Sequence, residues 1–560
     1  MPTIIVDPDD LSRLAGERIG PDRLAHFLDL VKGEFKGVEP DGSYRVELND
    51  TNRPDLWTTE GIARQIRSSL GSRREYPFFG ASPVGEIIVE PGLEKIRPYV
   101  GAFVVEDLQV TEKLLVQLIQ TQEKLAENLG RRRKALAIGI YNLRRIGFPV
   151  YYRPQDPDRH SYIPLGFEQP LSLRQILEQH PKGQQYGQIL AGLPRVPLLI
   201  DRNGMTLSMP PIVNSRETGQ VVPGDSDLFV EATGTDLELL VLALNIMACD
   251  FSDRGGKVRP VRTRFPHDTP LGREVTLPRR LDYSLELKAE DFSRLLGVEI
   301  RPAEVMAVLE RYGCDVTREG ERLKVFPPPV RADYLHPVDV IEDFAIARGY
   351  QTFSPRLPRD FTVGRFDALS LIEERVRELM VGLGYEELIS NILVSRQLLA
   401  DNMLQPDKKL VEVANPVSES HCVLRDSLMP SLLQAEAASA TAAYPHRLFE
   451  CGEVAVFDGN SPIGSQTRMR LGMILAQRQA GVSECHSDVE QLAWQMGWSL
   501  KVQAEDMPIF LPGRSARLVD GAGRPVGIIG ELHPAVLEKW GIAMPVAAAE
   551  IDLTALQEFR

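Results

Sequence analysis

Cysteine is scarce in this chain of 560 residues, which has five cysteines at scattered positions. An odd number without a Cys-x-x-Cys pair argues against both a disulfide framework and a zinc site. No apolar run approaches the roughly 20 residues of a membrane-spanning helix. The first residues also lack the charged region and hydrophobic stretch of a signal peptide. We therefore expect a cytoplasmic protein.

Positive charge is also in the minority, since the formal net charge is −14. Such a balance disfavours nucleic-acid binding over the whole surface, but it leaves room for local basic contacts. The clearest local cluster is Arg131-Arg-Arg-Lys134. A cluster of this kind is either a solvated face or a phosphate contact, and the sequence leaves both open.

The chain does contain a concentrated acidic run. Asp333, Asp339, Glu342 and Asp343 fall within eleven residues, and the last three have i, i+3, i+4 spacing after Pro337. Because proline favours the first turn of a helix, the spacing predicts three carboxylates on one helix face. Like charges so close together indicate a hard cation such as Mg²⁺. The alternative is that acidic side chains simply favour a helix N-terminus.

A weaker copy of this region lies near the start of the chain. Residues 10–64 mirror residues 291–343 in the order and spacing of their motifs. Two copies indicate one small α+β unit used twice, not a solenoid. At the last two acidic positions the first copy has Ala63 and Arg64. We therefore expect a cation only in the second copy.

The alternation of apolar strand-like runs and helical segments predicts a multidomain protein of mixed α+β and α/β class. We expect four parts: a small α+β unit (1–90), an α/β domain with a sheet (91–270), a second small α+β unit with the acidic run (271–356), and an α+β domain with a largely antiparallel sheet (357–560). Residues 254–264, rich in Pro, Arg and Gly, are expected to form a linker. Residues 520–525 are expected to form a hairpin turn.

A series of short motifs runs in order along the whole chain. It includes Asn52-Arg-Pro-Asp-Leu56, His180-Pro-Lys-Gly183, Leu207-Ser-Met-Pro-Pro-Ile-Val-Asn-Ser215, Asn415-Pro-Val-Ser-Glu-Ser420 and Gly530-Glu-Leu-His-Pro534. In this order and at this length, the motifs closely resemble the β subunit of phenylalanyl-tRNA synthetase, archaeal and eukaryotic type. The resemblance implies an (αβ)2 assembly in which the α subunit activates phenylalanine with ATP and charges tRNA-Phe.

For the β subunit, the resemblance implies tRNA binding, support of α and hydrolysis of mischarged Tyr-tRNA-Phe. It also implies that Asp333, Asp339, Glu342 and Asp343 bind Mg²⁺. None of these four residues lies in the segment expected to edit, so we expect the metal to be structural.

Residues 357–560 resemble a class II synthetase domain without its catalytic groups. In Arg447-Leu-Phe-Glu450 the arginine and glutamate are three positions apart, whereas active subunits of the family have them two apart. Gly521-Ala-Gly-Arg524 comes nearest to the second arginine motif, but Pro525 follows it directly. Phosphoryl chemistry depends on such arginines. We therefore expect this domain to pack against α without catalysing aminoacylation.

The resemblance places proofreading in residues 91–270 and carries it onto Leu199, Ser208, Glu231 and Thr233. An ionised Glu231 would accept the hydroxyl of tyrosine, and phenylalanine offers no such group. Ser208 and Thr233 would position a water or the ester. Each also has a structural alternative, since Thr233 can cap a helix and Ser208 can stabilise a turn.

One departure from the family pattern bears on this site. Where many relatives have a His-Asp pair, this chain has Tyr141-Asn142, which predicts altered editing. No Ser/His/Asp or Cys/His set is evident, so hydrolysis would use water without a covalent intermediate. The main alternative is a non-enzymatic scaffold that binds tRNA, stabilises α and has an inactive editing pocket. A free-standing deacylase is disfavoured, because it would not need the large C-terminal domain.

Overall fold

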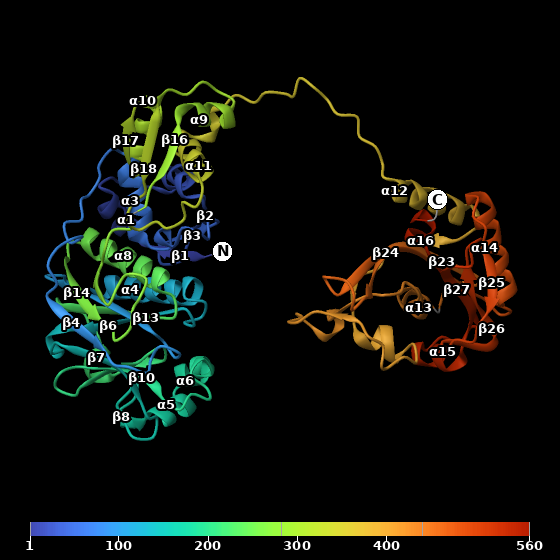
Figure 1. Cartoon of the computed structure of the whole chain (residues 1–560), viewed down its shortest axis with the longest axis horizontal. Coiled ribbons are helices and arrows are strands. Elements are labelled where there is room, and N and C mark those ends of the chain that lie inside the picture. Colours follow the sequence, from blue (N-terminus) through green and yellow to red (C-terminus); the bar gives the residue numbers. More distant parts are fainter. Residues whose placement is uncertain (1, 282, 440, 559–560) are drawn as a thin grey trace. The chain divides into compact units, whose positions relative to one another are not determined.

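The computed structural model describes residues 2–281, 283–439 and 441–558. By its internal contacts the chain divides into two compact units, Met1–Leu357 and Pro358–Arg560, which are described separately (Figure 1). Several sheets with helices packed on them make this a mixed α/β multidomain protein, as expected. Among the described residues, every helix is too short or too polar to cross a membrane.

The first unit opens with a small sheet of strand order β1-β3-β2. Its elements are β1 (Thr3–Val6), α1 (Pro8–Ala15), α2 (Pro21–Leu28), β2 (Gly33–Val38), β3 (Tyr44–Leu48) and α3 (Thr59–Ser69). Asp7 caps α1 by accepting two backbone N–H groups, and Gly16 ends the helix at φ 78°. A left-handed residue after the last turn favours glycine.

A second small sheet repeats this topology with the order β16-β18-β17. Its elements are β16 (Leu285–Lys288), α9 (Ala289–Leu296), α10 (Pro302–Arg311), β17 (Asp315–Glu319), β18 (Arg322–Phe326) and α11 (Pro337–Arg348). The structure therefore confirms the internal repeat. The two copies contact each other, since the hydroxyl of Tyr312 donates to the carbonyl of Leu30 (2.8 Å).

Between the two copies in sequence lies a sheet of ten strands. Nine follow the order β12-β11-β10-β7-β4-β14-β5-β13-β6, and β15 pairs with β14. Their bounds are β4 (Gly85–Val89), β5 (Tyr99–Glu106), β6 (Leu136–Asn142), β7 (Val150–Gln155), β10 (Val196–Ile200), β11 (Thr206–Met209), β12 (Val213–Asn214), β13 (Leu228–Gly234), β14 (Lys257–Arg264) and β15 (Glu274–Leu277).

Helix α8 (Leu237–Asp253) covers β5, β13 and β14, and it is buried along almost its whole length. Figure 1 shows β10, α5 and α6 gathered at one end of this unit. The other elements here are α4 (Glu112–Lys124), α5 (Leu173–Gln179), α6 (Pro181–Tyr186), α7 (Arg216–Gly219), β8 (Ser161–Tyr162) and β9 (Leu171–Ser172). Short 3-10 or π turns in the chain are η1 (Asp29–Val31), η2 (Pro54–Leu56), η3 (Leu125–Leu129), η4 (Leu143–Arg145), η5 (Gly187–Ile189), η6 (Tyr350–Thr352), η7 (Gln397–Asp401) and η8 (Glu419–His421).

The expected linker at 254–264 is wrong for most of its length. Residues 257–264 form β14, which lies between β4 and β5 inside the large sheet. Val258 and Val261 are buried while the arginines beside them are more exposed. The segment therefore has the buried face of a strand, but its many Arg and Pro residues make this pattern hard to see in the sequence. Because β15 pairs with β14, the large sheet also extends past residue 270.

The second unit contains a sheet of seven strands with the order β19-β23-β24-β28-β27-β26-β25. Its strands are β19 (Glu386–Glu387), β23 (His446–Phe457), β24 (Ser465–Ala476), β25 (Lys501–Ala504), β26 (Phe510–Val519), β27 (Pro525–Leu532) and β28 (Val546–Asp552). All pairs described in it are antiparallel apart from β19 with β23. The structure confirms the antiparallel sheet and the hairpin turn at 520–525.

Helices and a second, small sheet complete this unit. The helices are α12 (Ala368–Gly382), α13 (Met429–Ala438), α14 (Val482–Met496), α15 (Pro534–Trp540) and α16 (Leu553–Glu558), and the small sheet joins β20 (Leu393–Val394), β22 (Val423–Leu424) and β21 (Val411–Glu412). Helices α12, α14 and α16 pack with the sheet around one apolar core.

Candidate functional site

A cavity of about 350 Å³ lies where the large sheet curls back on itself. Strands β6 and β12 stand at opposite ends of the strand order, yet Tyr141 on β6 contacts Asn214 on β12 (3.2 Å). The amide of Asn214 also donates to the carbonyl of Ile140 (3.4 Å). These contacts bring the two edge strands of the sheet together beside the cavity.

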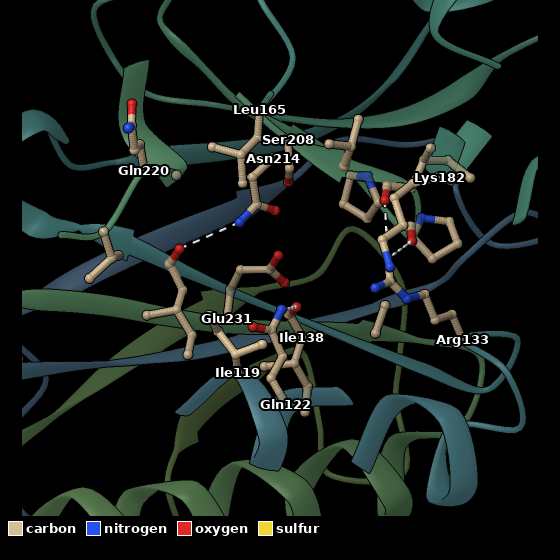
Figure 2. A pocket seen from close by; sticks show the side chains of 18 of the residues that line it. Ile119, Gln122, Arg133, Ile138, Leu165, Lys182, Ser208, Asn214, Gln220 and Glu231 are labelled. Carbon is tan, nitrogen blue, oxygen red and sulfur yellow. Dashed lines mark hydrogen bonds between the residues drawn. The ribbon is translucent and has the colours of Figure 1, made fainter. Parts of the chain in front are cut away.

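The cavity has an apolar side, a polar side and a basic end. Aliphatic residues of α4 and β6 form the apolar side, among them Ile119 and Ile138, and Ser208 and Glu231 contribute to the polar side. Figure 2 shows the carboxyl group of Glu231 pointing into the space below Asn214, with Arg133 and Lys182 at the far end. This mixture fits an amphipathic small ligand.

Glu231 on β13 is the most unusual group of the cavity. Its side chain is 3% exposed, and Oε1 accepts a hydrogen bond from the Tyr141 hydroxyl (2.8 Å). Oε2 is buried and has no hydrogen-bond partner among the described residues. Burial raises the pKa of Glu231 to about 7, against the hydrogen bond from Tyr141 and the charge of Arg97. A perturbed, half-satisfied carboxyl in a cavity marks a functional site.

The structure brings two of the four predicted editing residues into the cavity. Ser208 lines it beside Glu231, and the Tyr141 hydroxyl lies 2.9 Å from its Oγ. Leu199 is the partner of Ser208 across the β10–β11 pair and is fully buried in the core. Thr233 is fully buried two positions after Glu231, and it accepts a hydrogen bond from Arg97. Leu199 and Thr233 therefore do not line the cavity themselves.

Arg97 is a residue that the sequence did not single out. It is 1% exposed, and its guanidinium donates to both the hydroxyl and the carbonyl of Thr233. It also donates to the carbonyls of Arg133 and Lys134 (3.1 Å each). Arg97 thus ties the strand that carries Glu231 to the basic cluster. Nothing in the sequence marks this role, because the partners are 36 to 136 positions away.

The basic cluster divides into exposed and cavity-lining residues. Arg131, Arg132 and Arg133 all have left-handed backbone angles (φ 50°, 54° and 62°), a conformation that non-glycine residues adopt at a cost. Arg131, Arg132 and Lys134 are exposed. Arg133 lines the cavity, donates to the carbonyls of Pro211 (3.2 Å) and Ile212 (3.1 Å), and stacks on Tyr186.

The four carboxylates of the acidic run do not converge. Asp333 forms two hydrogen bonds with the guanidinium of Arg331, and Asp343 contacts Arg331 and the hydroxyl of Tyr334. Asp339 caps α11 by accepting the N–H groups of residues 335 and 336 (2.7 Å each). Glu342 accepts a hydrogen bond from Nζ of Lys32 (2.8 Å). Across the described residues, no three acidic, His or Cys side chains form a group that could hold a metal.

Helix geometry explains why these side chains diverge. Consecutive residues of a helix point about 100° apart, so Asp343 faces the core (5% exposed) while Glu342 points outward. Asp339 is engaged by the backbone, which is the N-terminal alternative noted above. The buried cation among these groups is Arg331, whose side chain is 2% exposed. As arranged here, the four carboxylates do not form a Mg²⁺ site, and the expected ligand set stays a prediction.

Comparisons with known proteins place the chain in a family. Residues 285–350 match the tRNA synthetase B5 domain, and residues 355–553 match the phenylalanyl tRNA synthetase beta chain CLM domain. A phenylalanine–tRNA ligase β subunit of Thermococcus gammatolerans is 37% identical over 569 residues, which cover 99% of each chain. The chain belongs to the phenylalanine–tRNA ligase β-subunit family.

A bacterial β subunit and one solved structure are also similar to this chain. The β subunit of Treponema pallidum subsp. pallidum is 40% identical over 522 residues, 91% of this chain and 86% of that one. The crystal structure of an N-terminal fragment of the phenylalanyl-tRNA synthetase β-subunit from Pyrococcus horikoshii also matches. Its TM-score is 0.59 at 36% sequence identity, and the match covers 62% of this chain and all of that one.

In this ligase β subunit, the two residues closest to a class II arginine motif are used structurally. Arg447 and Glu450 are three positions apart on β23, and neighbouring positions of a strand face opposite sides. Arg447 pairs with Glu484 and Asp488 on α14. Glu450 is buried and pairs with Arg425. The two side chains thus have separate partners.

Proposed function

We propose that this chain is the non-aminoacylating β subunit of a cytoplasmic (αβ)2 phenylalanine–tRNA ligase, in which the α subunit charges tRNA-Phe with the use of ATP. We further propose that its cavity hydrolyses Tyr-tRNA-Phe. The observation that carries the editing proposal is the buried Oε2 of Glu231, which has no partner among the described residues.

The cavity offers what discrimination between tyrosine and phenylalanine requires. Ile119, Ile138 and Glu231 all line the cavity, so an aromatic ring would pack against the two isoleucines while its phenol hydroxyl would meet Oε2 of Glu231. Phenylalanine in the same place would leave Oε2 of Glu231 buried and unpaired, which is costly. A site built to bind a hydroxyl rejects the analogue without it far better than an apolar pocket rejects an added hydroxyl.

The rest of the cavity suits the ester and the end of the tRNA. Ser208 and Asn214 supply polar groups beside Glu231 that orient a water for attack on the ester carbonyl. Lys182 and Arg133 at the other end supply positive charge for a nucleotide. Ser208 and His180 both line the cavity, but among the described residues Ser208 contacts Tyr141 while His180 contacts backbone groups of Leu165 and Lys182. We therefore propose direct attack by water. Thr233 and Leu199 support the site indirectly, through Arg97 and through the strand pair that carries Ser208.

The test compares Glu231→Ala with Glu168→Ala in the αβ enzyme. Glu168 is an exposed carboxylate of the same unit that does not line the cavity. We expect Glu231→Ala to slow hydrolysis of Tyr-tRNA-Phe by about a hundredfold while phenylalanylation continues at its normal rate. Equal hydrolysis by both variants and the wild type would overturn the editing proposal.

The scaffold remains the second candidate, and one observation favours it. Oε1 of Glu231 is already occupied by the protein's own Tyr141, so the carboxyl is partly used. If wild-type αβ leaves Tyr-tRNA-Phe intact and the α subunit is unstable without this chain, the chain is a scaffold with an inactive pocket.

Binding of Mg²⁺ at Asp333, Asp339, Glu342 and Asp343 also stays a prediction, supported by the resemblance and opposed by the position of Arg331.

A further inference from the structure

We infer that Tyr141 is a positioning residue of the cavity, whose hydroxyl holds the carboxyl group of Glu231 by one oxygen and leaves the other oxygen for the ligand. This inference rests on the proposed editing function and extends it to the residue by which the chain departs from the His-Asp pattern. Tyr141 itself lies in the wall and is fully buried.

The hydroxyl of Tyr141 is the centre of the polar side. It lies 2.8 Å from Oε1 of Glu231, 2.9 Å from Oγ of Ser208 and 3.2 Å from Oδ1 of Asn214. A phenol has one proton, and the strongest acceptor among the three is the carboxylate. Burial and the charge of Glu231 raise the pKa of Tyr141 far above its usual value, so the hydroxyl stays protonated and remains a donor.

The neighbouring strand is shaped for this contact. Gly139 is the partner of Glu231 across the β6–β13 pair. A Cβ atom at Gly139 would lie 2.3 Å from the Tyr141 oxygen and 2.5 Å from Oε1 of Glu231, closer than any real contact of this kind. The hydroxyl reaches the carboxyl only because position 139 has no side chain.

One alternative is that Tyr141 imitates the substrate and blocks the cavity. The contacts of Glu231 argue against this alternative. Tyr141 occupies only Oε1, while Oε2 is buried without a partner among the described residues and stays available to a ligand. A carboxyl group turns easily about its last torsion. Without the Tyr141 hydroxyl, neither oxygen would have a fixed direction, and Glu231 would lose a donor that lowers its pKa.

The variant Tyr141→Phe removes only this hydroxyl, and Tyr152→Phe is its matched control. Tyr152 is equally buried on β7, but its hydroxyl donates to the carbonyl of Arg97 (3.0 Å). Two readouts are needed. One is hydrolysis of Tyr-tRNA-Phe by the αβ enzyme between about pH 5 and pH 9. The other is calorimetric binding of free L-tyrosine and free L-phenylalanine to the full chain.

Tyr141 and Arg97 are the groups that act on the pKa of Glu231, whereas Tyr152, whose own pKa is raised by burial, stays neutral over this pH range. In Tyr141→Phe we expect the midpoint of the pH profile to move up by about one unit, because the stabilising donor is lost. We also expect the preference for tyrosine over phenylalanine to fall about tenfold at pH 7. Tyr152→Phe should keep both the midpoint and the preference.

Three results would overturn the inference: an unchanged midpoint and preference in Tyr141→Phe, faster hydrolysis in that variant, or wild-type chain that binds both amino acids equally. A different result separates the two proposals. If wild-type αβ does not hydrolyse Tyr-tRNA-Phe but Tyr141→Phe still loses the tyrosine preference, the role of Tyr141 stands and the editing reaction is wrong.

Discussion

Arg97 and Thr233 are joined by two hydrogen bonds, from Nε to the threonine hydroxyl (2.8 Å) and from Nη2 to its carbonyl (2.5 Å). The remaining Nη1 group of Arg97 holds the carbonyls of Arg133 and Lys134. Because Thr233 does not line the cavity, we expect it to influence the cavity through Arg97 and the basic turn. This arrangement distinguishes its role from that of Glu231.

A pair of substitutions at Thr233 tests that indirect role. Thr233→Val removes the acceptor for Arg97 Nε and leaves a buried donor unpaired, at a cost of about 1–3 kcal/mol in the free energy of unfolding. We expect a several-fold higher KM for Tyr-tRNA-Phe with little change in kcat, because the turn that carries Arg133 loosens. Thr233→Ser, which keeps the hydroxyl, should behave as wild type. If Thr233→Val abolishes kcat as Glu231→Ala does, Thr233 acts in the chemistry itself.

Gly139→Ala should disable the cavity without removing any functional group. The added methyl carbon would overlap the Tyr141 hydroxyl and Oε1 of Glu231, so both side chains must shift. We expect hydrolysis of Tyr-tRNA-Phe to fall by about tenfold or more while phenylalanylation is unchanged. The control is Gly382→Ala, where a Cβ meets nothing within 4 Å. Normal hydrolysis by Gly139→Ala would mean that the Tyr141–Glu231 contact is dispensable.

The sequence predicted the elements whose signals are local. The start of α11 follows from Pro337, and the turn between β26 and β27 follows from the Gly- and Pro-rich residues 520–525. The internal repeat was also visible, and it folds as two sheets of the same topology. Strand β14 was missed because its arginines and Pro260 resemble a linker when neighbouring strands are unknown.

The candidate site was only half visible for the same reason. Ser208 and Glu231 were found through motifs, but Arg97 and Tyr141 act through partners that are 136 and 90 positions away in the chain. The acidic run is the opposite case. Its spacing was clear, but the partners that separate its members, Arg331 and Lys32, approach from other elements.

Glu231 should make the first unit less stable as the pH rises. Its pKa in the folded protein is raised from 4.5 to about 7, so the folded state binds more protons than the unfolded state between these values. The free energy of unfolding therefore falls as the pH rises through this window and levels off above it. The full effect is about 3 kcal/mol. In urea unfolding, Glu231→Gln should lose this slope and exceed the wild type at pH 8, whereas Glu168→Gln should keep it.

Magnesium binding provides a test of the acidic run. Arg331 already neutralises Asp333 and Asp343 inside the fold, and a second cation there would be repelled. We expect calorimetric titration of this chain alone with MgCl2 to show no saturable binding, and its unfolding temperature to stay constant on addition of Mg²⁺. Saturable binding that disappears in Asp343→Asn would restore the magnesium site predicted from the resemblance.

The two copies of the repeat allow an internal comparison of buried charge. Arg331 lies between two carboxylates, Asp333 and Asp343. Its counterpart Arg53 forms one ion pair among the described residues, with Asp55, and also donates to the neutral amide of Gln65. All three carboxylates are nearly buried. Removing one partner of a buried pair costs about 3–5 kcal/mol, because the other charge is left uncompensated.

Arg331→Met should therefore destabilise the chain by more than Arg53→Met, because it leaves two buried carboxylates without a counter-charge instead of one. In urea unfolding at pH 7 we expect the Arg53 variant to lose about 3 kcal/mol and the Arg331 variant to lose more. The double variant Arg331→Met/Asp343→Asn should recover part of that loss, because the uncompensated charge of Asp343 is removed. Equal losses in the two single variants would show that Asp343 is stabilised by Tyr334 and not by Arg331.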